Sequence, residues 1–212
     1  MPLKPSSKAW MQRHINDTYV QLAAREGYRS RSAYKLLEIN ERDKLLLPGT
    51  FVIDLGAAPG GWSQVAGARV GAKGRVFAID LLPMQELAHV SFFQGDFTDL
   101  EIQAQLREEL PKGGVDLVIC DMSPNMTGIP NADQARVFNL AEEALEFAKG
   151  VLKPSGAFLV KVFQGADFEV FRQSLFASFL KVGPRKPKAS REESRELYML
   201  ARGLRPSAAP EL

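Results

Sequence analysis

The chain has 212 residues, of which 45% are hydrophobic and 25% charged, and its formal net charge at pH 7 is +2. This length suits one sizeable α/β domain, and the composition is that of an ordinary globular protein. No apolar run approaches the ~20 residues that cross a bilayer, and we expect no secretory signal in the first seven residues. A single cysteine, Cys120, cannot form a disulfide within the chain, which favours a cytoplasmic location.

The positive charge is concentrated towards the two ends of the chain. Residues 1–37 contain seven Lys or Arg and two Asp or Glu, and residues 181–205 contain eight and three, whereas the stretch between them is acidic. If both basic segments reach one face, they would attract a polyanion. Charge runs are more often solvated surface without a partner. Because aromatic residues lie among the charges of the first segment, we favour nucleic acid as the partner.

Two helices are predicted before the first strand. Residues 8–26 have apolar residues at helical spacing, and Gly27 is suited to end that helix. Ser30 or Ser32 is placed to cap a second helix.

Basic side chains accompany these helices. Arg29 and Arg31 suit contacts with phosphate groups. Lys35 lies on the second helix, and its stretch by itself favours a surface lysine paired with Glu38 at i, i+3.

The main motif follows the first predicted strand, residues 51–55. The strand ends in Asp54-Leu55, and the turn Gly-Ala-Ala-Pro-Gly-Gly then leads into a helix expected to run to about Val70. Glycine lets the backbone approach a ligand closely because it has no Cβ. The spacing differs from the Gly-x-Gly-x-x-Gly of dinucleotide sites, and Asp54 would repel a diphosphate. A cationic or zwitterionic adenosyl ligand suits this turn better. The alternative is a tight strand-to-helix turn that holds no ligand.

Acidic residues also end the next two predicted strands. Asp80 is placed to accept hydrogen bonds from ribose hydroxyls, and the apolar residues after it could pack on a flat base. Asp96 could bond an adenine amino group beside the apolar Phe97. Each of these carboxylates could instead cap a loop or a helix. The two strands are expected at 75–80 and 90–94.

The second half of the chain continues the alternation of strands and helices. Asp121 follows an apolar strand at its carboxyl end, where open α/β sheets place their chemistry. Lys161 lies near the carboxyl end of another apolar strand, and a lysine is seldom buried without a partner. We therefore favour a functional site for Lys161 over a lysine that reaches the sheet edge. Helices are expected at 99–110, 133–152 and 167–180, and strands at 115–120, 157–163 and 196–201.

We predict one α/β domain over residues 1–212, with a mostly parallel sheet and helices on both faces. Residues 181–195 are interpreted as a loop or an interrupted strand, and residues 1–7 and 203–212 as disordered. The last strand is expected to be antiparallel because only the short loop 187–195 precedes it. Neither histidine has a metal-like cluster around it, so we expect no metal.

Five blocks of the sequence together resemble the FtsJ/RrmJ family of S-adenosylmethionine-dependent RNA 2′-O-ribose methyltransferases. The resemblance extends from about Trp10 to Ala201 and implies a Rossmann-like, seven-stranded methyltransferase fold. It also makes residues 8–45 a basic helical extension that binds RNA. The blocks are residues 29–36, 54–63, 121–125, 160–165 and 190–196.

The resemblance implies roles for individual residues. It assigns S-adenosylmethionine as the cofactor and gives Lys35 a catalytic role, against the surface role that its own stretch favours. The catalytic residues are Lys35, Asp121, Lys161 and Glu196. The cofactor residues are Asp54, Gly56, Pro59, Gly60, Gly61, Trp62, Asp80, Leu81, Asp96, Phe97 and Asp121. Separately from the resemblance, the basic side chains of the two charged segments are predicted to contact RNA, namely Arg29, Arg31, Lys186, Lys188 and Arg191.

The compact length is similar to that of the bacterial ribosomal member, which implies a uridine ribose in the A-loop of large-subunit (23S) ribosomal RNA as the substrate. We expect a monomer that acts on ribosomal RNA within the large subunit. Ribose of tRNA or of an mRNA cap is the nearest alternative substrate. A non-catalytic RNA-binding assembly factor would keep the fold without turnover, although the intact set of four catalytic residues argues against it. A nicotinamide-dependent oxidoreductase is disfavoured by the glycine spacing and the basic ends.

Overall fold

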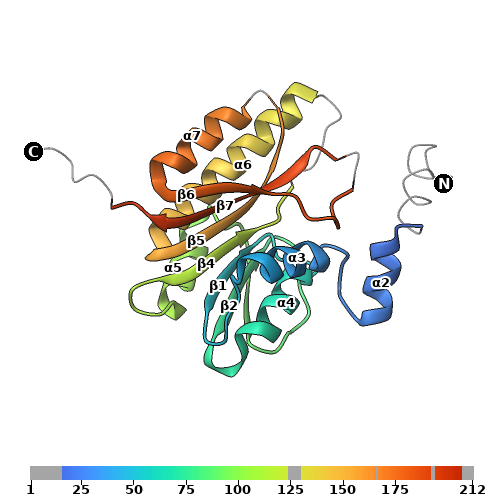
Figure 1. Cartoon of the computed structure of the whole chain (residues 1–212). Helices are drawn as coiled ribbons and strands as arrows, with labels where there is room; N and C mark the ends of the chain where they lie inside the picture. The colour runs from blue at the N-terminus through green and yellow to red at the C-terminus, as the bar shows by residue number, and fades with distance from the viewer. Residues whose placement is uncertain (1–15, 124–129, 166, 192–193, 207–212) are drawn as a thin grey trace, which may run out of the picture.

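The computed structural model describes residues 16–123, 130–165, 167–191 and 194–206. One seven-stranded sheet runs through the molecule, and helices cover both of its faces (Figure 1). The strands are β1 (Phe51–Leu55), β2 (Arg75–Asp80), β3 (Val90–Gln94), β4 (Val115–Cys120), β5 (Leu152–Phe163), β6 (Phe179–Arg185) and β7 (Glu196–Leu204). The helices are α2 (Thr18–Glu26), α3 (Ala33–Asp43), α4 (Gly61–Val70), α5 (Leu100–Glu109), α6 (Pro130–Val151) and α7 (Phe168–Ser178), with a 3-10 turn η1 (Gly71–Lys73).

The strand order is β3-β2-β1-β4-β5-β7-β6. Strands β1 to β5 pair in parallel, whereas β7 runs antiparallel to both β5 and β6. This confirms the predicted mostly parallel sheet with an antiparallel last strand. The chain turns from one half of the sheet to the other between β1 and β4, so the carboxyl ends of these neighbours flank a crevice.

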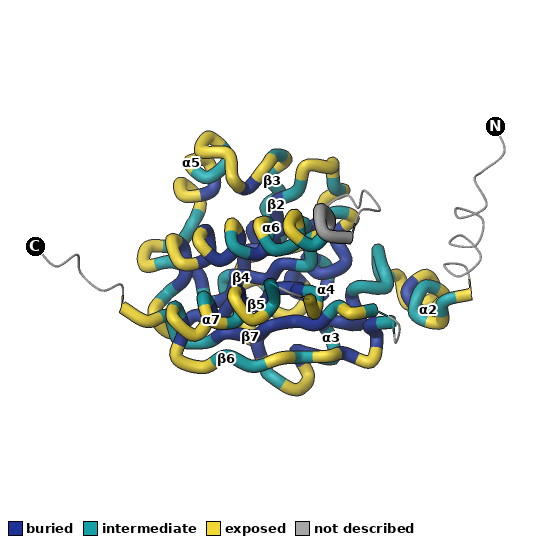
Figure 2. Tube along the Cα trace, turned by 90° about the horizontal axis from the view of Figure 1, so that it is seen from above, coloured by how far each residue is buried: buried dark blue, intermediate teal, exposed yellow. Residues whose placement is uncertain are grey.

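Two apolar layers bury the sheet, because side chains alternate between its faces along each strand. Ile53 packs with α5, α6 and α7 on one face, while Val52 packs with α3 and α4 on the other. The central strands β1, β2, β4, β5 and β7 are accordingly the most buried part of the molecule, while the edge strands and the outer sides of the helices are more exposed (Figure 2). Within the described ranges, no helix combines the length and the apolar character needed to cross a membrane.

The boundaries differ from the prediction at β6. The helix expected at 167–180 ends at Ser178, and Phe179, which is fully buried, begins a strand. That strand takes in residues 181–185, the start of the segment interpreted as a loop or an interrupted strand, so the second interpretation is confirmed there. Pro184 makes this strand hard to recognise in the sequence, because proline interrupts most strands. Here β6 lies at the sheet edge, where proline is tolerated.

The chain ends also differ from the prediction. Strand β7 continues to Leu204, two residues into the segment expected to be disordered. Helix α2 begins at Thr18, capped by Asp17, so a single helix over 8–26 is wrong for its described part. Residues 1–15 and 207–212 lie outside the described residues. Helix α2 stands apart from the sheet and packs through Ala23 on Tyr34 and Ala189 (Figure 1).

Candidate active site

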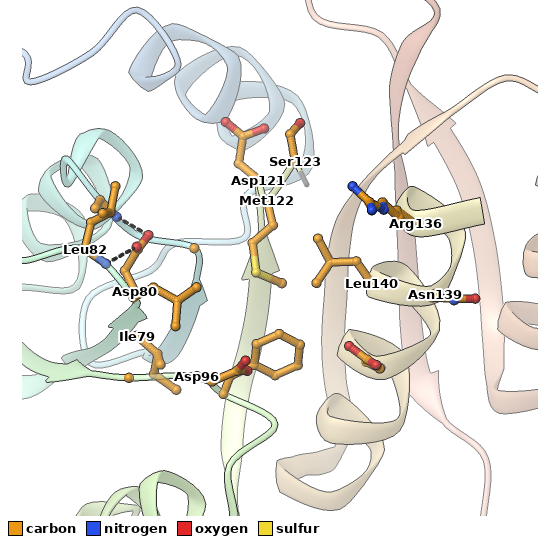
Figure 3. Close-up of a pocket in the computed structure, with 16 residues that line it drawn as sticks. Ile79, Asp80, Leu82, Asp96, Asp121, Met122, Ser123, Arg136, Asn139 and Leu140 are labelled. Carbon is orange, nitrogen blue, oxygen red and sulfur yellow. Dashed lines mark hydrogen bonds between the residues drawn. The ribbon is translucent and has the colours of Figure 1, made fainter. Parts of the chain in front are cut away.

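A cavity of about 690 Å³ opens at the carboxyl edge of the sheet (Figure 3). Loops after β1, β2, β3 and β4 form one side of it, and α6 forms the other. Its volume lies in the range of small-molecule sites. It is lined by Gly56, Ala58, Ile79, Asp80, Leu81, Leu82, Gly95, Asp96, Phe97, Asp121, Met122, Ser123, Arg136, Asn139, Leu140 and Glu143.

The glycine turn lies against the cavity and also against side chains of the protein itself. Gly56 lines the cavity with φ +75°, and a Cβ there would overlap the side chain of Met122. Gly60 has φ +105°, and a Cβ on it would lie 2.7 Å from Nη1 of Arg29. Gly60 is therefore needed where the N-terminal extension crosses the turn, which the ligand-based interpretation of the motif did not anticipate.

Asp80 and Asp96 act as loop caps and also line the cavity. Asp80 accepts hydrogen bonds at 2.8 Å from the backbone N–H of Ala58 and of Leu82. Asp96 accepts from the backbone and the hydroxyl of Thr98. Because the backbone holds both carboxylates in place, they present fixed negative charge to a ligand. A cavity of this size lined by several carboxylates fits a nucleoside cofactor that carries positive charge.

Asp54 lies beneath the turn rather than at the cavity wall. It is 1% exposed, its Oδ2 accepts from the hydroxyl of Ser63 at 2.6 Å, and its Oδ1 has no hydrogen-bond partner. Burial raises the pKa of Asp54 to about 7, and the negative charges of Asp121 and Asp80 act in the same direction. A carboxyl in this position holds its proton up to neutral pH.

Trp62 is buried behind the turn. Its indole N–H donates to the carbonyl oxygen of Ser32 at 2.8 Å, and its ring lies 5.5 Å from that of Tyr198. The described residues that line the cavity do not include Pro59, Gly60, Gly61 or Trp62. Their cofactor contacts stay predictions.

The four residues assigned to catalysis meet beside this cavity. Lys35 Nζ lies 2.6 Å from Oε1 of Glu196, so the expected pairing of Lys35 with Glu38 is wrong. Lys161 Nζ lies 3.2 Å from Oδ1 of Asp121 and donates to its backbone carbonyl at 2.6 Å. Both lysines are buried, at 6% and 8% exposure. Asp121 also lines the cavity, and it therefore joins the cofactor-sized space to the paired lysines.

Glu38 instead holds the loop that leads into β7. Its carboxylate accepts from the backbone N–H of Lys188 at 2.6 Å and of Ala189 at 3.0 Å. Ser190 follows in this loop, and its hydroxyl donates to Oε1 of Glu196 at 2.8 Å. Burial tends to raise the pKa of Glu196, but Lys35, with help from Ser190, outweighs it and lowers that pKa.

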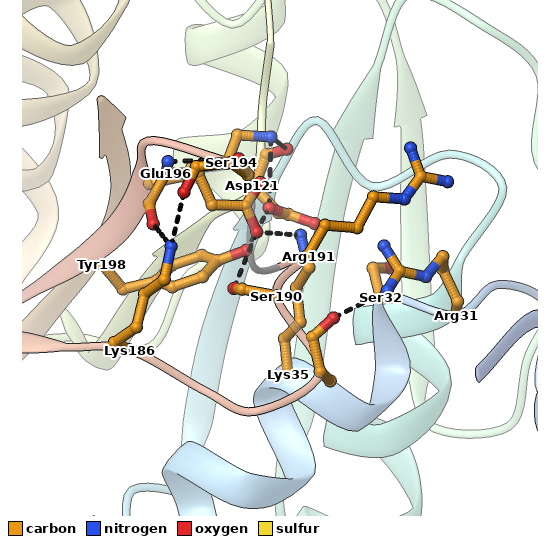
Figure 4. A network of polar contacts seen from close by, with 12 residues as sticks. Arg31, Ser32, Lys35, Asp121, Lys186, Ser190, Arg191, Ser194, Glu196 and Tyr198 are labelled. Carbon is orange, nitrogen blue, oxygen red and sulfur yellow. Dashed lines mark hydrogen bonds and ion pairs between the residues drawn. The ribbon is translucent and has the colours of Figure 1, made fainter. Parts of the chain in front are cut away.

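Tyr198 connects the two ion pairs and was not predicted. Its hydroxyl donates to Oδ1 of Asp121 at 2.7 Å, and Lys35 Nζ lies 5.7 Å from its ring centroid (Figure 4). Burial, with the charges of Asp121 and Glu196, raises the pKa of Tyr198 well above its usual value, so the hydroxyl remains a donor. The strand period offered one signal, because Tyr198 lies two residues after Glu196 and therefore on the same face of the strand. That Tyr198 directly opposes Lys161 depends on the register of β5 with β7.

Four of the five side chains assigned to RNA already contact the protein. Arg29 donates to the backbone carbonyls of Pro59, Gln85 and Glu86, and Lys186 to those of Ser194 and Glu196. Arg31 and Arg191 both lie beside Asp17. Lys188 is exposed. The RNA contacts of all five stay predictions.

Comparison with known proteins shows the family of the chain. The model of the family described as FtsJ-like methyltransferase matches residues 28–204. "Ribosomal RNA large subunit methyltransferase E" of Dechloromonas aromatica is 58% identical over 94% of this chain and 98% of that protein. The proteins of the same name from Azoarcus sp. and Neisseria meningitidis are 56% and 54% identical, over 97% and 94% of this chain and 100% and 97% of their own lengths.

A solved structure shares the fold. The crystal structure of a protein described as a ribosomal RNA methyltransferase from Plasmodium falciparum superposes with a TM-score of 0.76 at 26% identity, covering 84% of this chain and 98% of that one.

Proposed function

Because the chain belongs to the FtsJ-like methyltransferase family, whose cofactor is S-adenosylmethionine, we propose that it methylates a ribose 2′-oxygen of large-subunit ribosomal RNA, at a uridine of the A-loop. The observation that carries the proposal is the double role of Asp121, which lines the cavity and also holds Lys161. The names of the relatives support the choice of RNA. The target nucleotide rests on the family resemblance.

The residues of the cavity fit the cofactor. Asp80 and Asp96 would hold its nucleoside, between the apolar side chains of Leu81 and Phe97. When bound, S-adenosylmethionine supplies a methyl group activated by a sulfonium. The chain itself must then align the ribose hydroxyl and handle its proton.

Lys161 is the residue placed to act on the 2′-oxygen. Asp121 fixes its Nζ through two oxygens, one of the side chain and one of the backbone. Two roles follow for this nitrogen. As an ammonium it stabilises negative charge that develops on the 2′-oxygen, and as a neutral amine it accepts the proton itself. A pH–rate profile in single turnover separates them, since only the second role requires an ionisation of Lys161 before reaction.

The test is methyl transfer from labelled S-adenosylmethionine to large subunits that lack the modification, with the labelled nucleotide mapped. We expect one 2′-O-methyl uridine in the A-loop, lost in Lys161→Ala. The matched control is Lys153→Ala, which removes a 2.6 Å pair with Asp116 at the opposite end of the same two strands. Cofactor affinity, measured by calorimetry, should survive in both variants.

Other outcomes would redirect the proposal. Methylation of tRNA or of a capped RNA, with large subunits unmodified, would replace the substrate. Cofactor binding without transfer to any of these RNAs would favour the non-catalytic assembly factor. Transfer that persists in Lys161→Ala would remove this lysine from both proposed roles.

We also propose that the chain acts as a monomer in the cytoplasm. All four catalytic side chains come from one chain, so no second copy is needed to complete the site. The one cysteine, Cys120, is buried and unpaired, which suits a reducing compartment. Sedimentation of the chain bound to large subunits would give its stoichiometry.

A further inference from the structure

One carboxylate next to the loop that leads into β7 faces two arginines. Asp17 precedes α2 and caps it, with Oδ1 accepting from the backbone N–H of Tyr19 at 3.0 Å. Its Oδ2 lies 3.1 Å from Nε of Arg31 and 3.3 Å from Nε of Arg191. Both guanidinium groups point away from the Asp121–Glu196 cluster (Figure 4). Among the residues that the structure describes, two guanidinium groups thus share the Oδ2 atom of this carboxylate.

The carboxylate is an imperfect partner for both arginines. Nε of Arg31 is buried and makes no hydrogen bond, even though Oδ2 of Asp17 is close. Arg31 is otherwise well held, because it donates to the carbonyl of Ala189 at 2.8 Å. Arg191 is bound more loosely, with a side chain 40% exposed and a contact of 3.3 Å. An oxyanion with more acceptor atoms would satisfy these donors better.

The position of Arg191 relates this pair to the reaction. Ser190, its neighbour, donates to Glu196, which in turn holds Lys35. An RNA whose ribose reaches Lys161 would therefore carry its phosphates close to Arg191. A phosphodiester has the charge and the oxygens that a guanidinium group prefers.

We propose that Asp17 occupies, in the free protein, the place of an RNA phosphate on Arg191 and Arg31, and that RNA must displace it to bind. The carboxylate then acts as an internal competitor that weakens binding of RNA until the remaining contacts are made. This inference rests on the proposed function, because it requires RNA at the Lys161 site. If Asp17 had a purely structural role, its loss would weaken RNA binding, whereas the loss of a competitor strengthens it.

The test is Asp17→Asn, assayed by fluorescence anisotropy with a labelled RNA hairpin that carries the A-loop sequence. Asparagine caps a helix about as well as aspartate but has no charge to hold the arginines. We expect the dissociation constant for RNA to fall about threefold or more, and the log–log salt dependence to steepen by about one. Weaker or unchanged RNA binding would overturn the inference, because a purely structural tie can only lose affinity when it is broken.

Glu169→Gln is the matched control. It makes the same change in net charge and releases Arg172, held at 2.7 Å on α7, which lies across the molecule from α2 (Figure 1). We expect no change in its affinity for RNA. An equal gain in this control would assign the effect to overall charge and would also overturn the inference.

Arg191→Gln completes the set. It should weaken RNA binding, and in the double variant with Asp17→Asn most of the gain should disappear. A gain that persists in the double variant would exclude Arg191 as the group that Asp17 restrains. Because each arm measures binding rather than methylation, a normal methylation product with unchanged affinity in Asp17→Asn would remove this inference and leave the proposed function standing.

Discussion

Tyr198 shows how a single buried hydroxyl can position the residues proposed for catalysis. It donates to the same oxygen of Asp121 that pairs with Lys161, and it packs against Trp62 behind the glycine turn. A hydrogen bond to a charged group contributes about 1.5–3 kcal/mol when its partner is buried. The loss of this bond should therefore loosen Asp121 rather than unfold the protein.

We expect Tyr198→Phe to lower the rate constant of methyl transfer, measured in single turnover, about tenfold. The effect on cofactor affinity should be smaller. Tyr34→Phe is the control, since it removes a comparable 2.7 Å bond to Glu26, away from the cavity. Equal losses of rate in the two variants would show that Tyr198 only supports the fold.

Asp54 makes the stability depend on pH in an uncommon direction. Burial raises its pKa to about 7 in the folded chain, whereas an unfolded aspartate titrates near pH ~3.9. Between these values the folded state holds one proton more than the unfolded state. The free energy of unfolding therefore falls as pH rises through this range, by up to about 1.4 kcal/mol per pH unit for one group.

Asp54→Asn should abolish this contribution. Its free energy of unfolding relative to the wild type, measured with urea, should rise from pH 4 to pH 7 and level off above. In a Ser63→Ala background the bond that lowers this pKa is missing, so the free energy of unfolding of Asp54→Asn relative to its Ser63→Ala parent should keep rising to higher pH. A constant difference between Asp54→Asn and wild type at all pH values would contradict the prediction.

At the scale of elements, Asp43 ties the N-terminal extension to the antiparallel edge of the sheet. It ends α3, and its carboxylate accepts two bonds, of 2.6 and 2.8 Å, from Arg185 on β6. Its backbone carbonyl accepts a third bond, from Arg202 on β7. The hydrogen bonds from Arg185 lower the pKa of Asp43 against the opposing effect of burial. Helix α3 carries Lys35, so this tie also keeps Lys35 near Glu196.

We expect Asp43→Ala to destabilise the fold by about 2–3 kcal/mol, since a bidentate bond between charged groups is lost in a partly buried place. For a chain of this size that is a fall in Tm of about 4–12 °C, measured by calorimetry near pH 7. Glu169→Ala removes a pair of similar length that is exposed to solvent, so it should destabilise the fold far less. Equal losses in the two variants would mean that the contact with β6 does not hold α3.

At the scale of the whole molecule, the cavity lies between the carboxyl ends of β1 to β4 and helix α6, so a ligand there contacts five elements that are separate in the sequence. S-adenosylmethionine at 100 times its dissociation constant should stabilise the folded state by about 2.7 kcal/mol.

That stabilisation corresponds to a rise in Tm of about 5–11 °C, measured by scanning fluorimetry. Asp80→Asn, which removes a carboxylate of the cavity wall, should require more ligand for the same rise. Lys153→Ala at the other end of the sheet should respond like the wild type. An unchanged ligand requirement in Asp80→Asn would argue against Asp80 as part of the cofactor site.

The sequence by itself determined the order of strands and helices apart from β6, together with the glycine turn and the acids that follow successive strands. These features are local, since apolar runs, glycines and terminal carboxylates are recognised within a few residues. In a parallel sheet the carboxyl ends must also share one edge, so the amino-acid order alone was enough to place Asp80, Asp96 and Asp121 together.

Only the tertiary structure decided which distant groups touch. Lys35 pairs with Glu196 because α3 docks beside β7, and no pattern within α3 indicates that; the family resemblance was needed to single out this lysine. Tyr198 and the wall formed by α6 likewise depend on the register of β5 with β7 and on the packing of a long helix. Strand β6 was obscured by a proline that an edge strand tolerates. From the sequence, Arg31 and Arg191 were assigned to RNA, and their contacts with Asp17 were not predicted. Residues so far apart in the chain come into contact only in the folded structure.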